Sequence, residues 1–171
     1  MSKFYTGVGS RETPFDILSH MTMIAQRLQH EYILRSGGAQ GADSAFEDGA
    51  KDNKEIFYAS DATTEAMEIA KKFHPAWNRC SAYARKLHGR NAFQVLGRSL
   101  DTPSKFLICW TPDGCVSHKT RSINTGGTGT AISIAEAYGV KIFNLKLIEH
   151  KKYWLVYVIG KLVKGLIYGM A

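Results

Sequence analysis

Short apolar runs alternate along the chain with longer stretches in which apolar residues recur every three or four positions. Residues 4–8 read as a short buried strand, and residues 14–31 carry apolar side chains at helical spacing. Further strands are expected at 32–34, 56–59, 106–110 and 140–145, and further helices at 43–51, 65–73, 81–100 and 131–138. This alternation predicts an α/β, Rossmann-like three-layer fold, in which a mostly parallel sheet carries helices on both faces.

The pattern changes in the C-terminal segment, residues 146–171. Two apolar runs around a polar stretch at 149–152 suit a hairpin, whereas Leu155, Ile159, Leu162 and Leu166 also suit one face of a helix. We expect a strand-rich extension. It would pack on the domain formed by residues 1–145 or on a partner.

Three glycine-rich turns lie where a predicted strand hands over to a helix, at residues 6–11, 35–43 and 124–130. Glycine lets the backbone take positive φ and lets a ligand approach the bare chain. The helix that follows presents unpaired N–H groups and the positive end of its dipole. Since ligands of such sheets bind beyond the carboxyl ends of the strands, the three turns together predict a phosphate site.

Composition sets the class of protein. With 171 residues, 44% of them hydrophobic, the chain suits one well-packed domain. The formal charge is +7, but residues 141–171 hold six Lys against the single acid Glu149, so the excess lies mostly in the C-terminal segment. No apolar run reaches membrane-spanning length, and no signal-like N-terminus is seen. We expect a cytoplasmic protein without membrane contact.

The cysteines and histidines predict no metal site. Three cysteines without CxxC spacing support neither a disulfide framework nor a zinc knuckle. His74, His88 and His118 are far apart in sequence. No cofactor is expected either.

Each turn offers candidate ligand-binding side chains, and each has a structural alternative. Ser10 and Arg11 beside exposed N–H groups can clamp an anion, or they can belong to a tight turn with a surface arginine. Asp43 can cap its helix, or it can accept hydrogen bonds from a ribose or base. Gly89 is expected to bend or divide the helix of residues 81–100, which would place Arg90 and Asn91 near a helix start, facing a ligand or forming a solvated face.

The order Gly-Ser-Arg, Ser-Gly-Gly-Ala-Gln-Gly-Ala-Asp, Gly-Arg-Asn and Thr-Gly-Gly-Thr-Gly-Thr resembles the Rossmann-like core of the DprA/Smf proteins. These belong with the Lonely Guy phosphoribohydrolases in the SLOG superfamily. The resemblance implies binding of a nucleotide or of single-stranded DNA. The residues expected at the phosphate-bearing ligand, from the resemblance and from the glycine turns, are Gly9, Ser10, Arg11, Ser36, Gly37, Gly38, Gly41, Asp43, Arg90, Asn91, Gly126, Gly127, Thr128, Gly129 and Thr130.

The Lonely Guy enzymes release the base from nucleoside monophosphates, and His88-Gly89-Arg90 is similar to their arginine motif. Their Pro-Gly-Gly-x-Gly-Thr-x-x-Glu signature is altered here, because Thr125 replaces the proline and Ser133 the glutamate. A nearby carboxylate would stabilise the oxocarbenium-like state of glycosidic cleavage. Glu136 and Asp43 are the candidate replacements, and Glu136 also suits a solvated helix surface.

Three functions follow from these motifs. The first is a DprA-like protein that binds a nucleotide or single-stranded nucleic acid, with Trp110 at a strand end placed for base stacking. The alternative is a nucleotide N-glycosidase that uses Arg90 with Glu136 or Asp43. The third is a sensor of a nucleotide-derived signal that acts through self-association. A homodimer is expected because homo-oligomers are common in the superfamily.

Overall fold

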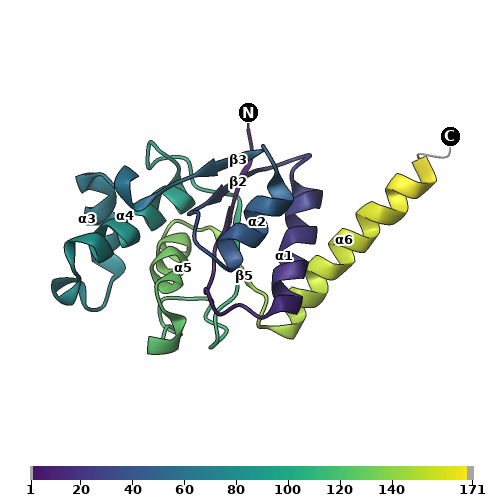
Figure 1. Ribbon diagram of the computed structural model, residues 1–171. Coiled ribbons are helices and arrows are strands. Elements are labelled where there is room, and N and C mark those ends of the chain that lie inside the picture. Colours follow the sequence, from purple (N-terminus) through teal and green to yellow (C-terminus); the bar gives the residue numbers. More distant parts are fainter. Residues whose placement is uncertain (1, 169–171) are drawn as a thin grey trace.

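A single sheet of five parallel strands organises the computed structural model, which describes residues 2–168, with side chains described as far as Leu162 (Figure 1). The strand order is β3-β2-β1-β4-β5, and every neighbouring pair is parallel. The strands are β1 (Phe4–Gly7), β2 (Ile33–Ser36), β3 (Lys54–Ile56), β4 (Phe106–Cys109) and β5 (Lys141–Asn144). The predicted α/β class with a mostly parallel sheet is confirmed.

Helices cover both faces of this sheet. One face carries α1 (Phe15–Leu28), α2 (Ala42–Ala50) and α6 (Ile148–Tyr168), and the other carries α3 (Thr64–Phe73), α4 (Ala82–Leu96) and α5 (Thr128–Ala137). Successive strand residues point to opposite faces, so Leu107 belongs to the core beneath α4 and α5, whereas Ile108 belongs to the core beneath α1 and α2. Three layers with two apolar cores result.

Helix α4 runs unbroken through Gly89, so the prediction that this glycine bends or divides the helix is wrong. A Cβ atom at Gly89 would lie 2.7 Å from Cγ of Met67, so the glycine serves the close approach of α3 and α4. The helix ends instead at Gly97, which has a φ of 77° that favours glycine. Arg90 and Asn91 therefore lie in the interior of a helix.

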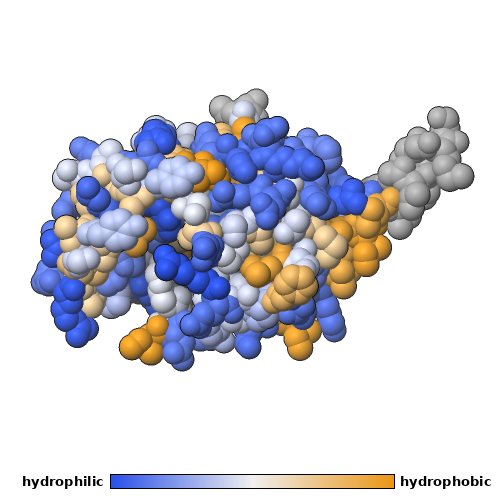
Figure 2. Space-filling model, viewed as in Figure 1, coloured by the Kyte–Doolittle hydropathy of each residue, from blue (hydrophilic) through white to orange (hydrophobic). Residues whose placement is uncertain are grey.

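The C-terminal segment forms α6, so the prediction of a strand-rich extension is also wrong. Trp154 and Val158, four residues apart, are both buried in the core beside α1, and this burial selects the helix. Leu155 and Ile159 are exposed instead, and Figure 2 shows apolar surface along this helix. None of the helices in the described part of the chain combines the length and apolar character needed to cross a membrane.

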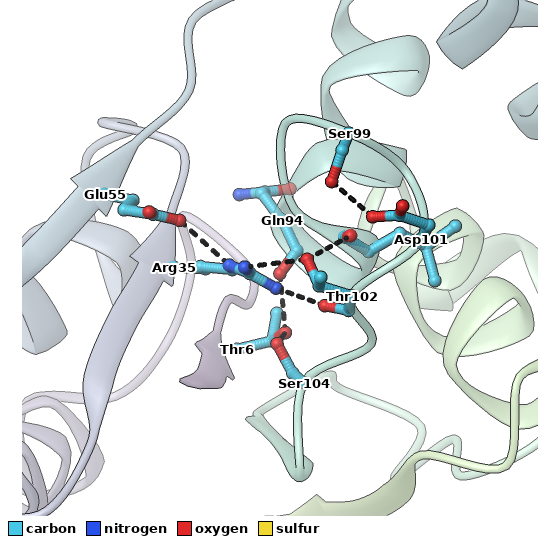
Figure 3. A network of polar contacts seen from close by, with 9 residues as sticks. Thr6, Arg35, Glu55, Gln94, Ser99, Asp101, Thr102 and Ser104 are labelled. Atoms are coloured by element: carbon cyan, nitrogen blue, oxygen red, sulfur yellow. Dashed lines mark hydrogen bonds and ion pairs between the residues drawn. The ribbon is translucent and has the colours of Figure 1, made fainter. Parts of the chain in front are cut away.

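Arg35, which opens the second predicted glycine turn, has a structural role. Its guanidinium lies between Glu55, at 2.9 Å, and Thr102, whose carbonyl oxygen accepts a hydrogen bond at 2.6 Å (Figure 3). Arg35 is 2% exposed, and its side chain faces the loop between α4 and β4. It links β2 and β3 to that loop, so we assign it a structural role and no role in ligand binding.

Candidate functional site

A cavity of about 610 Å³ lies beyond the carboxyl ends of β1 and β4. These strands are neighbours where the strand order reverses, which is where open α/β sheets bind their ligands. The first glycine turn, the middle of α4 and the third glycine turn form its walls. Its polar lining residues are Ser10, Arg11, Glu12, Asp43, His88, Arg90, Asn91, Gln94, Asn124, Thr125 and Thr128.

The third glycine turn is open toward this cavity. A Cβ atom added at Gly126 or Gly127 would meet no other atom within 4 Å, and both glycines line the cavity. Gly126 has a φ of 61°, which accounts for glycine there. Helix α5 begins directly afterwards at Thr128. The N–H groups of Gly129 and Thr130 donate to the carbonyl oxygens of Gly126 and Gly127 at 3.1 and 3.3 Å, whereas those of Gly127 and Thr128 have no partner among the described residues. This wall therefore offers N–H donors and a positive dipole end to an anion.

Two side chains fix the shape of the third turn. Asn91 donates a hydrogen bond from Nδ2 to the carbonyl oxygen of Gly127 at 3.1 Å. Asp113 accepts hydrogen bonds from the hydroxyls of Ser122 and Thr125; burial would raise its pKa, but these bonds lower the pKa to about 2. Asp113 thus holds the chain just before Gly126 as a permanent carboxylate.

In the second glycine turn, side chains of the protein itself accept hydrogen bonds from two N–H groups. Glu47 accepts a hydrogen bond from the N–H of Gly38 at 2.9 Å, and Asp43 accepts one from the N–H of Ala39 at 3.4 Å. Both carboxylates come from α2. Gly38 and Gly41 have φ values of 67° and 87°, so backbone conformation accounts for these glycines.

Most predicted residues of this second turn lie outside the cavity lining. The hydroxyl of Ser36 donates to the carbonyl oxygen of Gly7 at 2.7 Å, and a Cβ atom at Gly37 would lie 2.5 Å from Nε2 of Gln94. Gly38 and Gly41 are absent from the lining too, whereas Asp43 belongs to it. The second turn thus contributes a carboxylate to the cavity.

The first turn contributes a hydroxyl and a cation. A Cβ atom at Gly9 would lie 2.7 Å from Cβ of Ala42, so this glycine permits close packing of the turn on α2. The Ser10 hydroxyl accepts a hydrogen bond from the N–H of Glu12 at 3.0 Å. Arg11 is exposed at the cavity wall, where its guanidinium is available to a ligand.

Asp43 is buried at the cavity near the half-buried Arg90. Asp43 is 3% exposed, and burial raises its pKa to about 7 although the nearby Arg90 cation acts to lower it. Arg90 donates from Nη1 to the carbonyl oxygen of Gly37 at 2.7 Å, and burial lowers its pKa. With a pKa of about 7, the carboxyl group of Asp43 can both donate and accept a proton near neutral pH.

Gln94 is a cavity residue that the sequence motifs did not identify. It is 1% exposed, and within the described residues neither its amide nitrogen nor its amide oxygen has a hydrogen-bond partner. Nε of Arg90 is also buried and has no hydrogen-bond partner within the described residues. Unpaired buried polar atoms are costly, so their position at the cavity points to a ligand that pairs with them. Helical spacing could have found Gln94, because it follows Arg90 by four residues.

Several predicted residues lie elsewhere. Glu136 accepts a hydrogen bond from the N–H of His118 at 2.7 Å, and Ser133 contacts Nδ1 of His118 at 2.9 Å, so both anchor a loop. Trp110 is 7% exposed and packs in the core beneath α1, so its ring does not line the cavity. Gly129 and Thr130 are buried behind the third turn and lie outside the lining.

Comparisons with models of protein families, with curated proteins and with solved structures found no match for this chain.

Proposed function

We propose that this protein binds a nucleotide, or the phosphates of single-stranded nucleic acid, in the cavity beyond β1 and β4, as its resemblance to the DprA/Smf proteins implies. The observation that carries the proposal is the open N-terminus of α5. Gly126 and Gly127 leave space beside the N–H groups of Gly127 and Thr128, which have no partner among the described residues, and the same cavity holds arginine side chains. Bare N–H donors, a helix dipole and guanidinium groups are the recognised elements of a phosphate site.

Arg11 and Arg90 supply the charge in this proposal. Arg11 is exposed and unconstrained, so it can follow a phosphate oxygen, whereas Arg90 is held by Gly37 and keeps a buried Nε without a partner. One arginine therefore attracts the anion and the other fixes its position. Glycines and N–H groups read phosphate rather than base, so a second set of groups must distinguish ligands.

Gln94 and Asp43 form that second set. An amide presents a donor and an acceptor side by side, which suits the edge of a base or a pair of ribose hydroxyls. Asp43 adds an acceptor when it is ionised. A cavity of about 610 Å³ lies within the range of roughly 300–1,000 Å³ that small-molecule sites occupy. The proposed ligand therefore places its phosphate at Gly127 and its sugar or base at Gln94.

The test measures binding of three probes at low salt: inorganic phosphate, a panel of fluorescently labelled nucleoside monophosphates, and a labelled single-stranded oligonucleotide. Gln94→Leu should weaken nucleotide binding about tenfold, the loss of roughly 1.4 kcal/mol of hydrogen bonding, and leave phosphate binding unchanged. Gln26→Leu, on the exposed side of α1, serves as the matched control. If none of the three probes binds, the proposal is wrong.

Nucleotide and nucleic-acid binding differ in their dependence on length and salt. A mononucleotide that competes fully with the oligonucleotide would assign one phosphate site. Affinity that rises with oligonucleotide length and falls steeply with salt would assign a strand that continues beyond the cavity, since each neutralised phosphate adds about 0.7 to the salt slope for single strands.

The raised pKa of Asp43 favours one further candidate, a nucleotide N-glycosidase. A carboxyl group with a pKa of about 7 can protonate a departing base as an acid, and as a carboxylate it can stabilise an oxocarbenium-like sugar. In this reaction the bond between C1′ and the base breaks, and a water oxygen attaches to C1′. Mass spectrometry of nucleoside monophosphates incubated with the protein tests it: free base should appear with the wild type and disappear with Asp43→Asn. If the nucleotides stay intact at high protein concentration, the protein does not cleave them, and binding is its only proposed function at this cavity.

A further inference from the structure

Three potential metal ligands converge at the segment between α3 and α4. His74 follows the last residue of α3, Cys80 follows the short helix η2 (Trp77–Arg79), and His88 lies on α4. One ligand atom from each residue lies within 4.8 Å of the other two. Spacing along the chain does not group them, because 13 residues separate His74 from His88. The fold brings their ring centroids to 4.2 Å.

The distance between Cys80 and His74 is close to that between two ligand atoms of one metal ion. Sγ of Cys80 lies 3.7 Å from each ring nitrogen of His74. A tetrahedral zinc ion with Zn–N near 2.1 Å and Zn–S near 2.3 Å separates its ligand atoms by about 3.4–3.6 Å. Two imidazoles and one thiolate favour zinc and related ions over magnesium or calcium, which prefer oxygen ligands.

A hydroxyl on α5 orients His88 for this role. Nδ1 of His88 is 3.0 Å from the hydroxyl of Thr130 on α5, which leaves Nε2 as the ligand atom. A hydrogen bond to the second ring nitrogen is the usual way in which proteins orient a metal-binding imidazole. Nδ1 of His74 accepts a hydrogen bond from the N–H of Ala76 at 3.1 Å, so a metal ion bound at Nδ1 would have to replace this hydrogen bond.

Two cations, Arg121 and Arg90, lie near His88 in this cluster. Arg121 donates to the carbonyl oxygen of Phe73 at 2.8 Å and to Thr130 at 3.3 Å, so its own hydrogen bonds hold it. A thiolate from Cys80 would offset one positive charge of a bound ion.

We propose that His74, Cys80 and His88 bind one zinc-class ion, which fastens the segment between α3 and α4 to the wall of the cavity. Three protein ligands leave a fourth coordination position for water or another small ligand. Because His88 also lines the cavity, the ion sits behind the wall that faces Gly127 and Arg90. This site is independent of the proposed nucleotide function, since phosphate binding at α5 requires none of its ligands.

Cobalt(II) is the direct probe, because a tetrahedral cobalt site with a thiolate ligand shows visible d–d bands and a near-ultraviolet sulfur-to-cobalt band. The protein, treated with chelator and then titrated with cobalt, should show both bands and saturate at one ion per chain. Zinc should displace the cobalt. Cys80→Ser should abolish the sulfur-to-cobalt band, and His88→Gln should weaken binding at least tenfold. His30→Gln and Cys115→Ser are the controls, since His30 is exposed on the surface and Cys115 is buried elsewhere.

Alkylation of the unmodified chain gives a second readout that does not depend on a variant folding. Cys80 is partly exposed, whereas Cys109 and Cys115 are buried, so iodoacetamide should label Cys80 first. One equivalent of zinc should slow that labelling at least tenfold, and magnesium should leave it unchanged. Equal labelling rates with and without zinc, or a sulfur-to-cobalt band that survives in Cys80→Ser, would overturn the proposal.

Discussion

The second and third glycine turns look alike in sequence and differ in what their N–H groups do. In the second turn, α2 supplies Glu47 and Asp43, whose carboxylates accept from the N–H groups of Gly38 and Ala39. In the third turn, the start of α5 faces a cavity, and Gly127 leaves open space beside it. One turn is closed by the protein's own anions and the other is open to an external one.

The difference teaches that glycine spacing reports backbone geometry and does not report whether a site is vacant. Glycine is required in the second turn because Gly41 has a φ of 87° and its Cβ atom would lie 2.8 Å from Cα of Arg11. At Gly127 the φ is −61°, which any residue adopts, so the conformation alone does not call for glycine. Glycine at position 127 instead leaves open space beside the start of α5.

The largest expected effect separates the two turns by stability. Gly41→Ala should lower the free energy of unfolding by about 3 kcal/mol, because it combines a left-handed backbone with a clash against fixed backbone atoms. Gly127→Ala should change it by less than about 0.5 kcal/mol. Urea denaturation of both variants measures this contrast. Equal losses at the two positions would show that the third turn is as constrained as the second.

The next effect concerns binding. Gly127→Val should weaken binding of a labelled nucleoside monophosphate about 30-fold, or roughly 2 kcal/mol, because its side chain occupies the space beside the first N–H groups of α5. Gly160→Val on α6 is the matched control, since a Cβ atom there also meets nothing within 4 Å. Fluorescence anisotropy measures both affinities. An unchanged affinity in Gly127→Val would move the phosphate away from the third turn.

The carboxylate in the second turn should be visible in the pH dependence of stability. Burial raises the pKa of Asp43 to about 7, whereas an unfolded aspartate titrates near 3.9. Between these values the native state retains a proton that the unfolded state has lost. The free energy of unfolding should therefore fall as pH rises, by up to about 1.4 kcal/mol per pH unit from this group.

Denaturation between pH 4 and pH 8 tests this, because Asp43→Asn should lack that component of the slope. Asp113→Asn should keep it, since the pKa of Asp113 is lowered to about 2 and its titration lies below this range. Parallel curves for wild type and Asp43→Asn would mean that Asp43 is ionised throughout the range.

The smallest effect belongs to the exposed arginine at the rim. Arg11→Gln should weaken binding of a labelled single strand about fivefold, close to 1 kcal/mol, and reduce the salt slope by about 0.7. Arg79→Gln, exposed and outside the cavity lining, removes the same charge and should change neither value by more than a small amount. An equal loss in both variants would indicate attraction by net charge alone.

Sequence patterns predicted the fold well because buried parallel strands and amphipathic helices carry strong periodic signals. They failed at Gly89, where a packing contact with Met67 accounts for the glycine, and in α6, where burial of Trp154 decides between helix and strand. Both outcomes depend on residues distant in sequence. No local pattern contains that information.

The sequence motifs identified some of the residues that line the cavity and missed others. Arg11, Asp43, Arg90, Asn91 and residues 124–128 line one cavity. Gln94 was missed because it belongs to none of the sequence motifs. Only the folded structure shows that its buried amide has no hydrogen-bond partner among the described residues. The proximity of His74 and His88 was missed because it results from the packing of α3 against α4, which residue spacing does not show.

Helix α6 has a practical consequence for anyone who shortens this chain. Figure 1 shows it leaving the domain at an edge, so it resembles a removable appendage. Its first turns nevertheless bury Trp154 and Val158 beside α1. A truncation before Trp154 would uncover the hydrophobic core and promote aggregation, whereas a cut beyond Leu162 would spare both anchors.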